Sequence, residues 1–161
     1  MGYNSPQEYN NHIEQNWGKE PAKACKLAEE GKKNYPNDAE ILGRLGYCHK
    51  ILQKGDYGLF FLEKAYKMNP SHPLIKIWIE DAYLAYGWKN YSDPELCAKL
   101  WKRALEINPD HKQYFYEIGY LYSNSKTPQK ALEWLNQAIE NGLADDKVYT
   151  ARGNAYKNTG Q

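Results

Sequence analysis

The chain has 161 residues, of which 42% are hydrophobic and 14% aromatic, and 15 residues are tyrosine. So many aromatic and aliphatic residues exclude an intrinsically disordered chain. The formal net charge of +1 gives no field that would attract nucleic acid or an anionic membrane, and no apolar run approaches the ~18 residues of a membrane span. We therefore expect a folded protein that binds neither nucleic acid nor membrane.

Apolar residues recur at helical spacing along the chain, with Pro, Gly, Asn and Asp between the segments. Ser5-Pro6-Gln7-Glu8 is a capping box with proline at the first helical position. No alternating strand pattern remains beside the helices, so the sequence predicts an all-α fold. The predicted helices cover residues 6–17, 21–34, 39–53, 57–68, 73–88, 94–107, 111–124, 128–141 and 146–158.

Three cysteines, Cys25, Cys48 and Cys97, lie far apart within predicted helices. An odd number at such spacing favours small buried thiols in a reducing compartment over disulfides. The polar N-terminal residues also lack the apolar core of a secretion signal. We therefore expect a cytoplasmic protein whose cysteines are reduced.

Short proline-containing stretches recur between the helices, at Pro36, Pro70 and Pro109. Pro70 lies 34 residues after Pro36, and Pro109 lies 39 residues after Pro70. A period of 34 residues with two helices in each period is the signature of tetratricopeptide repeats. The sequence therefore predicts a chain of helical repeats, one of them with five extra residues.

The residues within each period also resemble the tetratricopeptide repeat family, whose pattern begins W-x2-L-G-x2-Y and continues with A-x3-F and a final Pro. The fourth repeat matches with Phe115, Gly119 and Tyr122 in its first helix and Ala131 and Ala138 in its second. The resemblance implies a right-handed superhelix (solenoid) of about four helix-turn-helix repeats plus one additional C-terminal helix. The expected repeats of this single domain, residues 1–161, are 5–38, 39–72, 73–111 and 112–145, with a partial repeat or capping helix at 146–161.

The third repeat departs from the family pattern because of its five extra residues. Its first helix fits in either of two registers about two residues apart. One register directs Trp78 and Asp81 toward the groove of the superhelix, and the other directs Lys76, Glu80 and Tyr83 there. The extra residues also place two aromatics that the repeat does not need, Trp88 and Tyr91, in or beside a loop. Either a functional edge or an extended helix that packs its own tip would account for them.

The helix predicted at 111–124 presents three stripes of side chains, at 100° per residue. One stripe contains Gly119, which would let this helix approach its partner opposite Ala131 and Ala138. A second stripe contains Tyr114 and packs on the preceding repeat. The third stripe consists of Tyr116, Glu117 and Tyr120.

In this family the concave groove, lined by the first helix of each repeat, is the usual ligand surface. The resemblance therefore implies a protein or peptide partner, bound as an extended segment or a helix. Tyrosines suit this role, because each gives a large rigid contact with a polar tip. The candidate partner-binding residues are Tyr9, Ile13, Arg44, Tyr47, Trp78, Asp81, Tyr116, Glu117, Tyr120, Lys147 and Asn154. That individual tyrosines only pack between helices is an alternative that stays open.

No motif for catalysis is visible. The four histidines, His12, His49, His72 and His111, lie in different repeats, and no His or Cys pair has the spacing of a zinc site. A phosphate-binding loop, a nucleophile elbow and an HExxH motif are also missing. We expect a protein that is not an enzyme and carries no cofactor or metal.

A second hypothesis concerns the C-terminal helix. Tyr149, Gly153 and Tyr156 fit the first helix of a repeat whose second helix is missing. These residues would then form a homodimer contact, or the chain would be a targeting fragment of a larger multi-domain protein. Both alternatives to peptide binding stay open at this point.

Overall fold

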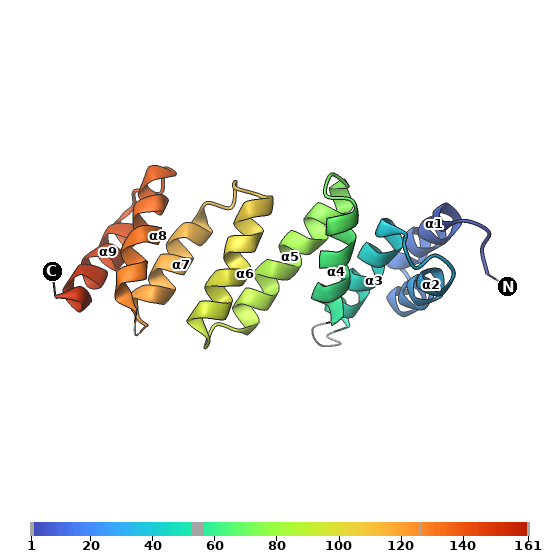
Figure 1. Ribbon diagram of the computed structural model, residues 1–161, viewed down its shortest axis with the longest axis horizontal. Coiled ribbons are helices and arrows are strands. Elements are labelled where there is room, and N and C mark those ends of the chain that lie inside the picture. Colours follow the sequence, from blue (N-terminus) through green and yellow to red (C-terminus); the bar gives the residue numbers. More distant parts are fainter. Residues whose placement is uncertain (1, 53–56, 126, 161) are drawn as a thin grey trace. The chain divides into compact units, whose positions relative to one another are not determined.

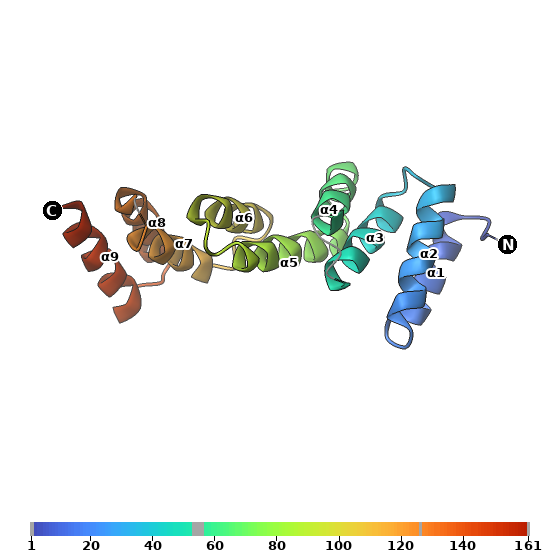
Figure 2. The same ribbon diagram turned by 90° about the horizontal axis from the view of Figure 1, so that it is seen from below.

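The computed structural model describes residues 2–52, 57–125 and 127–160, and the only regular secondary structure in these ranges is α-helix (Figures 1 and 2). The helices are α1 (Pro6–Trp17), α2 (Pro21–Asn34), α3 (Ala39–Ile51), α4 (Tyr57–Met68), α5 (Pro73–Lys89), α6 (Pro94–Ile107), α7 (Gln113–Ser123), α8 (Pro128–Glu140) and α9 (Asp146–Thr159). The predicted all-α fold is confirmed, and the predicted bounds are within two residues of these. The predicted end of the third helix at residue 53 lies outside the described residues.

Side-chain caps and prolines explain where the helices begin. The Oγ atom of Ser5 accepts a hydrogen bond from the backbone N–H of Glu8 at 3.2 Å, as in the predicted capping box. Aspartate caps α3, α6 and α9 in the same way. Proline at the first turn, where its missing N–H costs no helical bond, opens α1, α2, α6 and α8.

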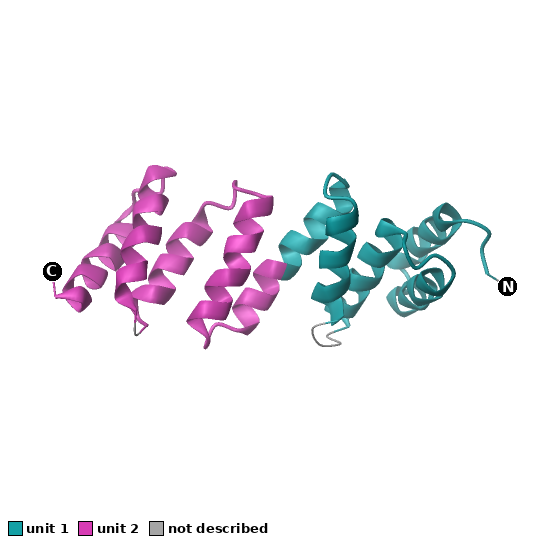
Figure 3. Ribbon diagram, viewed as in Figure 1, with its two compact units in different colours: residues 1–82 teal, residues 83–161 magenta. Residues whose placement is uncertain are grey.

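The chain divides into two compact units, residues 1–82 and residues 83–161, with the boundary inside α5 (Figure 3). In the first unit α1 packs on α2, α2 on α3, and α3 on α4. In the second unit α6 packs on α7, α7 on α8, and α9 on both α7 and α8. Each unit is therefore a stack of helix pairs. The expectation of one domain over 1–161 stays a prediction.

Small residues let the paired helices of unit 1 come close. In α3, a Cβ atom at Gly46 would lie 2.8 Å from the carbonyl oxygen of Gly58 in α4. No real side chain tolerates that distance, so the two backbones are in direct contact here. Fully buried Leu42 and Leu62, on the same two helices, fill the space beside them.

The core of unit 2 is built around Trp101 of α6, which is fully buried. Its Nε1 donates a hydrogen bond to the carbonyl oxygen of Leu84 at 3.3 Å, and Gly87 provides the space for its ring. The tip of α5 closes over it, since the ring of Trp88 lies edge-on to Trp101 with centroids 4.7 Å apart. The extra residues of the third repeat therefore lengthen α5, whose tip packs on Trp101.

The prediction that all three cysteines are reduced is wrong for two of them. Cys25 of α2 and Cys48 of α3 form a disulfide, with their Cα atoms 5.5 Å apart. The two positions are 23 residues apart in the sequence, but α2 packs on α3 and both residues lie on the shared face. Cys97 is a buried free thiol, as predicted. Since disulfides persist in oxidising compartments, the cysteines no longer support the expectation of a reducing, cytoplasmic environment.

None of the helices described here is long and apolar enough to cross a membrane.

Candidate functional site

The candidate residues on α1 do not reach the surface. Tyr9 and Ile13 are both fully buried in unit 1. The Tyr9 hydroxyl accepts a hydrogen bond from Nδ2 of Asn34 at 2.6 Å, so it belongs to the packing of α1 on α2. Neither residue exposes any surface, so the packing gives no support to a partner contact by these two residues, and that contact stays a prediction.

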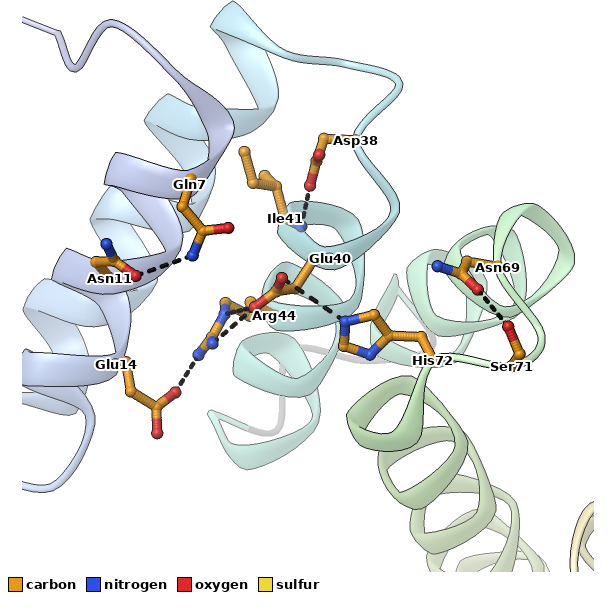
Figure 4. Close-up of polar contacts among 10 residues, drawn as sticks. All are labelled: Gln7, Asn11, Glu14, Asp38, Glu40, Ile41, Arg44, Asn69, Ser71 and His72. Atoms are coloured by element: carbon orange, nitrogen blue, oxygen red, sulfur yellow. Dashed lines mark hydrogen bonds and ion pairs between the residues drawn. The ribbon is translucent and has the colours of Figure 1, made fainter.

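Arg44 of α3 is only 5% exposed and is held by two carboxylates (Figure 4). Its Nη1 donates to Oε2 of Glu14 at 2.6 Å, and its Nη2 donates to Oε1 of Glu40 at 2.8 Å. The other oxygen of Glu40 lies 3.6 Å from Nε2 of His72. The donors of Arg44 are thus used within unit 1, where they join α1 to α3.

Tyr47 of α3 stacks between two tryptophans of unit 1. Its ring centroid lies 5.4 Å from that of Trp17 and 5.5 Å from that of Trp78, with interplanar angles of 19° and 18°. Nearby, Lys50 forms an ion pair with Asp81. Of the two registers weighed for α5, the one with Trp78 and Asp81 directs its side chains toward α3. We call Trp17, Tyr47 and Trp78 the aromatic ladder.

The remaining candidates meet in unit 2. Tyr116, Glu117 and Tyr120 project from α7, and Lys147 and Asn154 project from α9, which packs on α7. The pocket between these helices has a volume of about 260 Å3 and opens widely to solvent. It is lined by Tyr116, Tyr120, Asp146, Lys147, Thr150, Ala151 and Asn154. We call Tyr116, Glu117, Tyr120, Lys147 and Asn154 the α7–α9 face.

The side chains of the α7–α9 face have no hydrogen-bond or ion-pair partner in the part of the chain that the structure describes. Tyr120 is 41% exposed, and the rings of Tyr116 and Tyr120 lie 5.9 Å apart. Burial raises the pKa of Glu117, and the positive charge of Lys147 opposes that rise. Burial and the Glu117 carboxylate raise the pKa of Tyr116, so its hydroxyl stays neutral at physiological pH.

Tyr91 lies beside this face and is absent from the predicted site residues. It follows α5, is 38% exposed, and stacks on Trp88 with ring centroids 5.7 Å apart. Its pKa is raised by burial and by the neighbouring Tyr120 and Glu117. The signal in the sequence was the five-residue insertion, which places a tyrosine where the repeat pattern has none.

The described residues contain neither a metal-binding cluster nor an activated thiol. No three His, Cys, Asp or Glu side chains among them could together hold a metal ion. Burial raises the pKa of the Cys97 thiol to about 12, so it remains protonated and is a poor nucleophile.

Comparison with known proteins gives a match to one repeat of the chain and to its fold. Residues 113–141, which comprise α7 and α8, match the family model described as tetratricopeptide repeat. The "BBSome complex member BBS4" of Bos taurus is 27% identical over 137 residues, which is 85% of this chain and 25% of that protein. The chain thus spans about a quarter of the length of this relative.

Solved structures cover nearly the whole chain. "MamA 41-end from Desulfovibrio magneticus RS-1" matches with a TM-score of 0.61 and 17% identity, over 99% of this chain and 88% of that one. A "Crystal structure of MamA protein" matches with a TM-score of 0.62 and 20% identity, over 96% of this chain and 82% of that one. These similarities confirm the predicted helical-repeat fold.

Proposed function

We propose that this tetratricopeptide-repeat protein is a scaffold that binds an extended segment of another protein on its α7–α9 face. One observation carries the proposal: four side chains of the α7–α9 face, from two helices, line one open pocket, and none of the five side chains of this face has a polar partner among the described residues. Helical repeat proteins use the surface along their stacked helices to bind partners. The name of the bovine relative, a complex member, supports a role in protein association.

The candidate residues of unit 1 are less suited to binding a partner than the α7–α9 face. There the candidate side chains are used for internal contacts, since Arg44 pairs with two glutamates and Tyr47 lies inside the aromatic ladder. Trp78 is only 9% exposed. Replacement of these residues would disturb folding, so they make poor probes of binding.

The chemistry of the α7–α9 face suits a peptide. Tyr116 and Tyr120 offer broad, rigid rings that lose little entropy on binding. Glu117, Lys147 and Asn154 supply an acceptor, a donor and an amide that can orient a backbone or a side chain. The pocket is open along α7 and α9, which favours an extended segment over an enclosed small molecule.

The test is affinity capture from the source cell with the full chain, followed by affinity measurement on the captured partner. The double variant Tyr116→Ala/Tyr120→Ala should weaken binding at least tenfold. Tyr57→Ala is the matched control, because Tyr57 is 68% exposed and lies on α4 of the other unit. Unchanged affinity of a folded double variant, shown by its circular dichroism, would refute the proposal.

A homodimer through α9 is the second candidate. Tyr149 and Tyr156 are 46% and 38% exposed on this helix, and no atom lies within 4 Å of a Cβ at Gly153. These residues form an apolar strip with an open gap that a second copy could fill. Light scattering would test it: a mass that falls by half in Tyr149→Ala/Tyr156→Ala supports the dimer, and a monomeric wild-type chain rules it out.

A further inference from the structure

Glu117 lies on α7 of the α7–α9 face, between Tyr116 and Tyr120 in the sequence. Tyr116 precedes it, and Tyr120 lies one helical turn later on the same side of α7. Tyr91, in the segment between α5 and α6, lies close enough to Tyr120 and Glu117 for their charges to raise its pKa. Glu117 thus has two tyrosines beside it on its own helix and a third, from a separate segment, within electrostatic reach.

Among the described residues, no cation lies at ion-pair distance from the Glu117 carboxylate. Glu117 forms no ion pair or hydrogen bond with any other described residue, although burial removes part of its hydration. Lys147 acts on it electrostatically but is exposed and outside ion-pair distance. In unit 1, by contrast, the buried guanidinium of Arg44 is fully paired with carboxylates.

We propose that Glu117, Tyr91, Tyr116 and Tyr120 form a recognition site for an arginine side chain of the bound segment. The inference rests on the proposed function and names the chemistry of its ligand. A guanidinium placed here would form charge-assisted hydrogen bonds with the carboxylate. Its flat surface would lie against the tyrosine rings and gain cation–π attraction.

Acidic, apolar and lysine side chains would fit the site less well than arginine. An acidic side chain would be repelled by Glu117. An apolar side chain would cover the carboxylate and leave it without a partner, which costs free energy. A lysine ammonium would satisfy the charge, but it lacks the planar fork that matches both a carboxylate and a ring.

The first test uses a defined probe and the whole protein. The peptide acetyl-Ala-Ala-Arg-Ala-Ala-amide is titrated to millimolar concentration against the 15N-labelled chain, and NMR shifts are followed. Its counterpart with citrulline has nearly the same shape without the charge. We expect the arginine peptide to shift the signals of Tyr91, Tyr116, Glu117 and Tyr120 and to bind at least fivefold more tightly than the citrulline peptide.

Two variants localise the effect. Glu117→Gln should weaken arginine-peptide binding at least fivefold, since it keeps the shape of the side chain and removes its charge. Glu133→Gln, the same change at an exposed position on α8, should bind within twofold of wild type. Equal binding of arginine and citrulline peptides, unchanged binding by Glu117→Gln, or shifts confined to other surfaces would overturn the inference.

The captured partner separates this inference from the proposed function. If Tyr116→Ala/Tyr120→Ala loses the partner while Glu117→Gln retains it, the face is correct and the arginine site is wrong. If both variants retain the partner, the proposed function itself fails. Loss of the partner in both variants, with Glu133→Gln unaffected, supports both proposals.

Discussion

Gly119 of α7 is in direct contact with Leu135 of α8. A Cβ atom at residue 119 would lie 2.6 Å from Cγ of Leu135 and 3.2 Å from its backbone nitrogen. The glycine was expected opposite Ala131 and Ala138, and both are indeed buried, but the side chain that fills the space is Leu135. The conformational cost of a glycine inside the helix is therefore offset by the close packing of α7 on α8.

Gly119→Ala should destabilise the protein by up to about 2 kcal/mol. The added methyl group overpacks the contact with Leu135, which costs roughly 1–3 kcal/mol, while better helix propensity returns about 1 kcal/mol. Urea unfolding followed by circular dichroism measures the difference. Gly153→Ala is the control, because Gly153 is exposed on α9 and no packing neighbour lies within 4 Å of a Cβ there, and it should stabilise by about 0.5–1 kcal/mol. Equal effects of the two changes would contradict the packing argument.

Reduction of the disulfide should lower the free energy of unfolding by about 3 kcal/mol. Cys25 and Cys48 close a loop with a sequence separation of 23. A cross-link of that length lowers the conformational entropy of the unfolded chain, which raises the free energy of unfolding by about 3 kcal/mol. Urea unfolding with and without dithiothreitol measures it. The variant Cys25→Ala/Cys48→Ala should not respond to dithiothreitol, whereas Cys97→Ala should respond like wild type. A count of three reactive thiols in the unfolded, unreduced chain would show that the disulfide is not formed.

Arg44→Met should destabilise the protein by about 2–3 kcal/mol. The change keeps most of the apolar volume but leaves Glu40, whose side chain is 22% exposed, without its cation. Lys130→Met is the matched control: it breaks an exposed pair with Glu95, and such pairs add little to stability. Thermal unfolding of both variants makes the comparison. Similar melting temperatures for the two would contradict a structural role for Arg44.

Glu117→Gln should raise the melting temperature at pH 7. Burial raises the pKa of Glu117 in the folded protein above its ordinary value of 4.5, so the folded state binds more protons than the unfolded state between these two values. The free energy of unfolding of wild type therefore falls as the pH rises through that interval. The glutamine of the variant does not ionise, so the variant avoids this loss of stability. The advantage should vanish below pH 4.5, where Glu117 is protonated in both states. Scanning calorimetry over this range checks it, and an advantage independent of pH would contradict the electrostatic cause.

The same titration predicts how arginine-peptide binding depends on pH. Binding needs the Glu117 carboxylate, so affinity should fall as the pH drops through the raised pKa. The hydroxyls of Tyr91 and Tyr116 stay neutral in this range because their pKa values are raised above 10. The citrulline peptide should show no such dependence in NMR titrations.

Much of the site could be placed from the sequence, but not the state of each side chain. Helical periodicity put Tyr116, Glu117 and Tyr120 on one stripe, and the structure leaves Tyr120 exposed there. The same periodicity put Tyr9 on a comparable stripe, yet the structure buries it against α2. Periodicity gives the direction of a side chain around its helix axis, whereas burial depends on which other helix lies in that direction.

The sequence by itself determined the helices, since caps, prolines and the apolar period are local and act within a few residues. It also determined the repeat, because each helix pair leaves an apolar face that the next pair must cover. Only the tertiary structure decided the Cys25–Cys48 bond, the pairing of Arg44 with Glu14, and the place of Tyr91 beside Glu117. Each of these joins residues that are distant in the chain, and such contacts arise only from the packing of one helix on another.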